Sequence, residues 1–113
     1  MTTIQDLSQR DRALQKANRV RVATAALLAE IADLPTREGA RTVAQLIERA
    51  DPRVGHLTPA RLLVAPHRYG PNRMRAIVKS AGVPSDKPLR QMTDRQRDVL
   101  SLAVLASLAE PTR

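Results

Sequence analysis

The sequence lacks cysteine and is almost without aromatic side chains: it has no Phe, no Trp and one Tyr among 113 residues. Without cysteine there is no disulfide scaffold, thiolate metal site or cysteine nucleophile, and the composition suits a reducing cytosol. Without aromatics, a core is built by packing the aliphatic faces of helices, because β-sheets usually draw on aromatic and β-branched side chains. These absences favour an all-α protein in the cytoplasm.

Long apolar runs are missing as well. The first ten residues, MTTIQDLSQR, contain no apolar stretch typical of a signal peptide, and no stretch approaches the roughly 20 apolar residues that span a bilayer. A length of 113 residues is that of one ordinary domain. We therefore expect a small helical protein without a membrane partner.

Residues suited to catalysis are also scarce. The two histidines, His56 and His67, fall in loop-like segments, and neither has the neighbours of a catalytic triad. Two histidines and scattered carboxylates do not form a recognisable metal-binding set, and no Gly-Lys-Ser/Thr phosphate loop is present. The sequence thus predicts no enzyme activity, no catalytic or metal-ligating residue, no cofactor and no small-molecule substrate.

Positive charge is what the sequence has in excess, with 19 Lys and Arg against 11 Asp and Glu and a net charge of +8. Such a balance favours a polyanionic partner, although a GC-rich coding sequence also raises the share of Arg and Ala. The position of the charges decides between these two causes. Between Arg61 and Arg97 nine basic residues accompany only two acids, whereas residues 30–51 hold five acids and three arginines. Because a solvated face normally mixes both signs, this local excess indicates an anionic partner.

The N-terminal part of the chain has the pattern of one long helix. Neither Pro nor Gly occurs in residues 1–34, which predicts a basic helix from Ile4 to Asp33. Its first half is polar nearly all round, which is typical of a segment that is frayed or ordered by a partner. Its second half has apolar residues at helical spacing, which are Val20, Ala23, Leu27, Ile31 and Leu34.

Residues 35–113 are expected to form a helical domain of short helices. After a connector at 35–40, capping boxes at Thr42 and Thr93 and the pair Thr58-Pro59 mark three helix starts. A further helix is expected at Arg73–Ala81, closed by Gly82. The buried residues expected in the last helix are Val99, Leu100, Ala103, Val104 and Leu108.

The loop before Arg73 has the composition of a phosphate site. A helix N-terminus offers free backbone N–H groups and a partial positive charge to an anion. Gly70 allows a close backbone approach, and Arg68, Arg73 and Arg75 supply charge around it. Such a site grips the nucleic-acid backbone without reading base edges directly. From the tetrapeptide Tyr69–Asn72 alone, a plain turn is the preferred interpretation.

The segment from Ala60 to Leu100, ARLLVAPHRYGPNRMRAIVKSAGVPSDKPLRQMTDRQRDVL, resembles a helix–two turns–helix module, expected here at about residues 57–108. That module occurs in a small-subunit ribosomal protein and in certain DNA glycosylases. Its glycine-containing loop, its helix with a central Ile and its Thr-Asp-x-Gln helix start match Tyr69-Gly70, Arg73–Ile77 and Thr93–Gln96. The catalytic domain of the glycosylases has no counterpart in this chain.

Over residues 10–101 the chain is also similar to the actinobacterial type of integration host factor. The segments LQKANRVR, VAQLIERA, LTPARLL and MTDRQRDVL resemble its helices in order and approximate spacing. The resemblance implies sequence-tolerant binding to duplex DNA in shaping the nucleoid or in a phage integration complex. The Lys that usually follows the loop glycine is Pro71 here, so Arg68 or Arg73 would have to make that phosphate contact.

We accordingly predict a nucleoid-associated protein that binds double-stranded DNA through the phosphate backbone. The residues predicted to contact DNA are Lys16, Arg19, Arg21, Arg61, Arg68, Tyr69, Gly70, Asn72, Arg73, Arg75, Lys79, Arg90 and Arg95. Arg97 lies near the last two and is a further candidate. Two alternatives remain open: binding to structured RNA, and a protein-interaction adaptor that uses the apolar helix Val99–Leu108 to dock a partner.

Overall fold

The computed structural model describes residues 4–109, with side chains from residue 8 onward, and within that range it has helices and no strand. The chain is therefore all-α, as predicted. The order of its helices is α1 (Ile4–Asp33), α2 (Thr36–Glu48), the short 3₁₀ helix η1 (Pro52–Val54), α3 (Pro59–Leu62), α4 (Pro71–Ala81), the 3₁₀ helix η2 (Leu89–Gln91) and α5 (Asp94–Ser107). None of the described helices has an apolar stretch long enough to cross a membrane.

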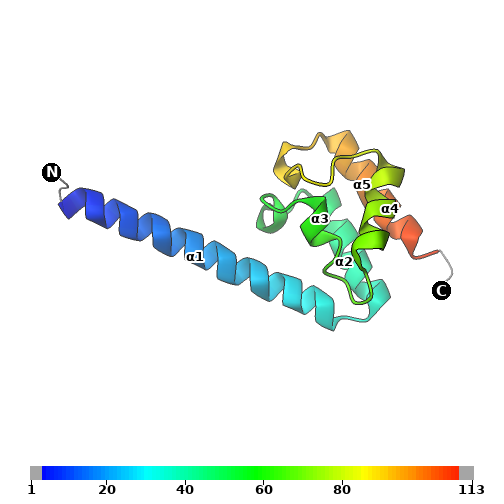
Figure 1. Cartoon of the computed structure of the whole chain (residues 1–113), viewed down its shortest axis with the longest axis horizontal. Coiled ribbons are helices and arrows are strands. Elements are labelled where there is room, and N and C mark those ends of the chain that lie inside the picture. Colours follow the sequence, from blue (N-terminus) through cyan, green and yellow to red (C-terminus); the bar gives the residue numbers. More distant parts are fainter. Residues whose placement is uncertain (1–3, 110–113) are drawn as a thin grey trace.

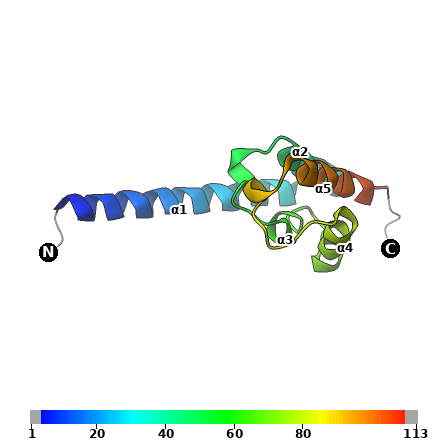
Figure 2. The same ribbon diagram turned by 90° about the horizontal axis from the view of Figure 1, so that it is seen from above.

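Helix α1 has the predicted bounds but packs against the body only through its C-terminal part. Its N-terminal half extends away from helices α2 to α5 (Figures 1 and 2), which makes the molecule 62 Å long. Of the apolar residues expected at helical spacing in the second half of α1, Leu27 and Ile31 are buried. Val20 and Ala23 are exposed, and Leu34 is half-buried. Residues 8–23 are exposed on every face of the helix. A helical segment without tertiary packing is marginal on its own, so this half is suited to contact with a partner.

The core lies between α2, α4 and α5. Val43 and Ile47 of α2 pack with Leu100 and Val104 of α5 in one apolar cluster. Ser101 joins the two helices, because its hydroxyl donates to the carbonyl of Ala44 at 2.8 Å. Buried Ser101 and Ser107 were not expected, and Val99, expected to be buried, is on the outer face at 37% exposure. Ala103 and Leu108 are half-buried.

The predicted start of α2 at Thr42 is wrong. The helix begins at Thr36, directly after Pro35, and residues 36–40 of the expected connector belong to it. The Thr42 hydroxyl donates to the carbonyl of Glu38 at 2.8 Å, so it binds within the helix and caps nothing. Within this helix Gly39 lies close to the end of α1: a Cβ there would be 3.0 Å from the carbonyl oxygen of Ile31, so a larger residue would push the two helices slightly apart.

The other helix starts agree better with the sequence pattern. The capping box of α5 is complete: Thr93 Oγ1 accepts from the N–H of Gln96 at 3.1 Å, and Gln96 Oε1 accepts from the N–H of Thr93 at 3.0 Å. Helix α3 starts after Thr58 as predicted, although the Thr58 side chain makes no cap hydrogen bond. Helix α4 begins at Pro71, two residues before the predicted Arg73, because proline suits the first helical position.

Candidate nucleic-acid interface

Tyr69 anchors the loop that precedes α4. Its side chain is 4% exposed, and its hydroxyl lies 2.7 Å from Ser107 Oγ on α5. The Ser107 hydroxyl donates to the carbonyl of Val104, so the Tyr69 hydroxyl must be the donor to Ser107. The backbone N–H of Tyr69 also donates to the carbonyl of Pro66 at 3.0 Å. The Tyr69 side chain, which was predicted to contact DNA, is thus buried and fixes the loop to the core.

Arg68 lies at the tip of this loop in a conformation that is uncommon for its residue type. Its φ of 67° is in the left-handed region, and its side chain is exposed. A left-handed conformation costs a residue with a Cβ about 1 kcal/mol. The anchored Tyr69 and the turn from Pro66 hold the backbone in this shape, and the result is an arginine directed outward beside the start of α4.

The start of α4 is open. Its N-cap is Gly70, no side chain caps the helix, and its first turn contains no acid. Gly70 has an ordinary extended conformation with φ of −95°, and a Cβ placed there would meet nothing within 4 Å. The described chain therefore leaves space beside Gly70 at the helix N-terminus, where an anion could approach the free backbone N–H groups.

Basic and polar side chains surround this open end. The guanidinium of Arg73 lies 4.6 Å from the centre of the Tyr69 ring, a cation–π distance that holds it beside the loop. Arg75 donates through Nη2 to Asn72 Oδ1 at 3.1 Å. Lys79 follows Arg75 one helical turn later and is exposed. The opposite face of α4 holds Met74, Ile77 and Val78 in the core, so the basic residues lie on the solvent side.

Among the side chains of residues 8–109, no carboxylate forms an ion pair with the arginines around the start of α4. Among the residues that the structure describes, the ion pairs are Arg53 with Asp51 and Arg97 with Asp94. Neither pair involves Arg68, Arg73 or Arg75. Because unpaired cations close together repel one another, an anionic partner would stabilise this arrangement.

Two of the remaining basic residues have roles within the fold. Arg97 is 14% exposed, donates to the carbonyl of Met92 at 2.8 Å and pairs with Asp94, so it is committed to the start of α5. Arg90 is exposed on η2, where its backbone N–H donates to the carbonyl of Gly55 at 2.9 Å. Arg95 is exposed in the first turn of α5, and Arg61 is exposed on α3.

The predicted DNA-contacting residues therefore fall into separate places. Arg68, Gly70, Asn72, Arg73 and Arg75 come together around the start of α4; we call this group the α4 cluster. Lys16, Arg19 and Arg21 are exposed on the projecting half of α1, away from α4 (Figure 1). The two groups cannot form one compact site, and a ligand that touches both must be extended.

The apolar C-terminal helix, which suggested an adaptor, is divided between core and surface. Leu100 and Val104 are buried, whereas Leu102 is 65% exposed and Leu105 is also on the outer face.

Within residues 4–109 no group of three or more His, Cys, Asp or Glu side chains is arranged to hold a metal ion. Comparisons with protein-family models, curated proteins and solved structures found no match to this chain.

Proposed function

We propose that this protein binds double-stranded DNA through the phosphate backbone, with little sequence preference, and acts as a nucleoid-associated architectural protein. The observation that supports this most directly is the open N-terminus of α4, which has neither a side-chain cap nor an acid and is surrounded by arginines. A phosphate oxygen is the natural acceptor for the free N–H groups and guanidinium donors at such a site. The resemblance to the actinobacterial integration host factor supports the same function.

The projecting half of α1 is proposed as a second contact. Lys16 and Arg19 lie one turn apart on one side of that helix, and neither belongs to an ion pair of the described chain. Since a helix rises about 1.5 Å per residue, Lys16 lies about 25 Å from the C-terminal end of α1. A duplex that contacts both α1 and the α4 cluster must follow the length of the molecule or bend toward it. This is the basis for proposing a part in DNA architecture, in the nucleoid or in a phage integration complex.

A nucleic-acid titration tests the proposal. Fluorescence anisotropy with a 5′-labelled DNA duplex, the corresponding single strand and a duplex RNA would be measured at several salt concentrations. If about six phosphates are contacted, the logarithm of the association constant should fall against the logarithm of salt with a slope of roughly −5. Two unrelated duplex sequences should bind with affinities within about threefold, because phosphate contacts do not read sequence.

Matched variants locate the contact. Arg73→Ala is expected to weaken duplex binding and to reduce the salt slope by about 1. Arg41→Ala, which removes an exposed arginine of α2 in the acid-rich part of the chain, should leave both unchanged. Equal loss in the two variants, or tighter binding to duplex RNA than to DNA, would refute the proposal. Absence of duplex binding at low salt would refute it as well.

A further inference from the structure

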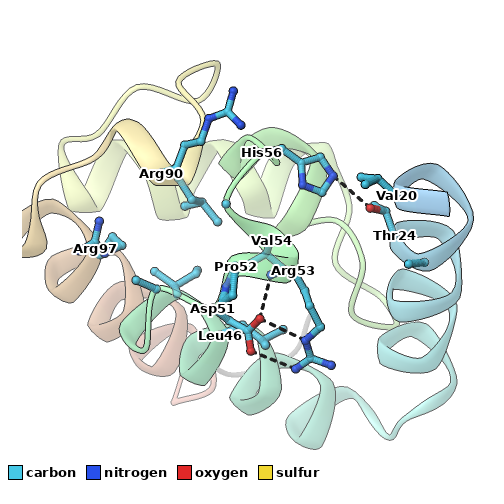
Figure 3. A pocket seen from close by; sticks show the side chains of 15 residues that line it. Val20, Thr24, Leu46, Asp51, Pro52, Arg53, Val54, His56, Arg90 and Arg97 are labelled. Atoms are coloured by element: carbon cyan, nitrogen blue, oxygen red, sulfur yellow. Dashed lines mark hydrogen bonds and ion pairs between the residues drawn. The ribbon is translucent and has the colours of Figure 1, made fainter. Parts of the chain in front are cut away.

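A groove of about 680 Å³ lies beside η1, and no residue of the α4 cluster is among those that line it. It extends from the middle of α1, past η1, to η2 and the start of α5 (Figure 3). Its volume is within the range of about 300–1,000 Å³ typical of small-molecule sites. The residues that line it are Val20, Ala23, Thr24, Leu46, Ile47, Ala50, Asp51, Pro52, Arg53, Val54, Gly55, His56, Leu89, Arg90 and Arg97.

Most of the groove surface is apolar. Ile47, Val54 and Leu89 belong to the core and form part of its lining. Val20 and Ala23 of α1 contribute a wall, and both are exposed to solvent there. They are two of the apolar residues that recur at helical spacing in the second half of α1. Their exposure leaves apolar surface uncovered beside the core, which a ligand with an apolar body would bury.

The walls of the groove are joined to one another by hydrogen bonds. The N–H of Leu89 donates to the carbonyl of Leu57 at 2.9 Å, which fixes η2 beside the segment that follows η1. Thr24 Oγ1 on α1 lies 3.0 Å from His56 Nε2 in a side-chain hydrogen bond. The groove is therefore formed without a ligand, as small-molecule sites usually are.

The charged groups around the groove leave one cation without a partner. Arg53 is paired with Asp51 at 3.0 Å, and its hydrogen bonds hold the pKa of that carboxyl below its ordinary value, so the pair stays ionised and neutral overall. Arg97 is paired with Asp94. Arg90 has no ion-pair partner among the side chains of residues 8–109, and it lies with His56 along one edge of the groove, opposite Arg53 and Asp51 (Figure 3).

We propose that this groove binds a small molecule with an extended apolar body and a single carboxylate, the carboxylate facing Arg90. An apolar lining with one unpaired guanidinium at its edge fits such an amphipathic anion. It does not suit a phosphate backbone, whose charge is repeated along the whole strand. The proposal assigns Arg90 to this ligand and is independent of DNA binding by the α4 cluster.

Biphenyl-4-carboxylate, with biphenyl-4-carboxamide as its uncharged analogue, provides the test. Each would be titrated into ¹⁵N-labelled full-length protein, and the amide shifts followed by NMR. We expect saturable shifts confined to residues 20–24, 46–56 and 89–97, with the carboxylate bound about threefold to tenfold more tightly than the amide. Arg90→Gln should abolish that preference, and Ala23→Phe, which places a ring in the groove, should weaken both compounds at least tenfold.

Control variants establish that the compounds bind in the groove. Arg61→Gln removes an exposed arginine that does not line the groove and should leave both affinities unchanged. Circular dichroism melting curves of each variant would establish that it is folded. No saturable shift at millimolar compound would overturn the proposal, as would equal affinity for the acid and the amide. It would be overturned too if the groove amides shifted with protein concentration alone, because a second copy would then occupy the groove.

Discussion

Helices α4 and α5 begin in opposite ways, although both pack in the same core. The start of α5 is satisfied within the chain: Thr93 and Gln96 form a reciprocal capping box, and Asp94 provides the acid that the helix dipole favours. The start of α4 has a glycine where α5 has its threonine, and it has no acid in its first turn. Where α5 has Asp94, paired with Arg97, α4 has arginines that form no ion pair within the described part of the chain.

This difference separates a structural helix start from one suited to a ligand. A cap residue contributes about 1 kcal/mol and an acid in the first turn about 0.3–1 kcal/mol. Glycine is itself an acceptable N-cap, so Gly70 costs α4 only a few tenths of a kcal/mol relative to a capping side chain. Helix α4 does lack the acid, and cations near its positive end are unfavourable. The start of α5 shows that a helix of this fold can have both a capping side chain and an acid in its first turn. The proposed contact with DNA would supply at the start of α4 the negative charge that α5 obtains from Asp94.

The largest expected effect comes from removing the charge of the α4 cluster. Changing Arg68, Arg73 and Arg75 together to Gln should reduce the salt slope of duplex binding by about 3 and weaken binding roughly 100-fold or more at moderate salt. Anisotropy titration over a salt series measures both quantities. The matched control changes Arg37, Arg41 and Arg49, which are exposed in and just after α2, to Gln. A similar loss in the control would mean that total charge, and not the α4 start, determines binding.

The next effect tests the comparison directly, because Gly70→Asp gives α4 the cap and the acid that α5 has. The position accepts a side chain without strain or clash. The variant should unfold with a free energy about 0.5–1 kcal/mol higher than the native chain, as measured in urea. Its carboxylate would occupy the place proposed for a phosphate, so DNA affinity should fall about tenfold.

Gly70→Asn is the control for that substitution. It supplies a cap of the same shape without the charge, so it should stabilise the helix while leaving most of the DNA affinity. If Asp and Asn weaken binding equally, then the loss is steric, and the charge at the helix end does not determine binding. If neither changes binding, the α4 start is not the contact.

A third prediction concerns α5, whose N-terminus is capped within the chain. Thr93→Ala removes the side-chain acceptor for the N–H of Gln96 and should lower the free energy of unfolding by about 1 kcal/mol. Because α5 starts without need of a ligand, duplex affinity should stay within about twofold of the native value in the same titration. A large loss of affinity would show that the start of α5 also touches DNA.

The capping box of α5 and the glycine end of α4 could be predicted from the sequence because both are local. Thr93 and Gln96 satisfy each other within one turn, and Gly82 has the left-handed conformation, φ 68°, that glycine favours at a helix end. The capping box predicted at Thr42 has the same sequence pattern, but the helix start that it predicted is wrong. The helix already begins at Thr36, and within its first turns Gly39 packs closely against the end of α1, a tertiary contact that the local pattern does not show.

The role of Tyr69 could not be predicted for a similar reason. In the sequence it is a lone aromatic in a basic loop, which resembles a stacking residue. Its burial depends on Ser107, a residue 38 positions away whose small polar side chain gave no signal within an apolar helix. Likewise, the groove depends on Val20 and Ala23 staying uncovered, which helical periodicity alone cannot reveal.

The smallest expected effect separates the two functions of the Tyr69 side chain. Tyr69→Phe removes the hydroxyl that donates to Ser107 but keeps the ring beneath Arg73, so the free energy of unfolding should fall by about 0.5–1.5 kcal/mol while DNA affinity changes little. Tyr69→Leu removes the ring as well and should weaken duplex binding further, by about twofold to fivefold, because Arg73 loses its cation–π contact. Urea unfolding and anisotropy on the same samples measure the two quantities. Equal DNA affinity of the Phe and Leu variants would mean that the ring does not position Arg73, and that Tyr69 contributes to the α4 cluster only by anchoring its loop.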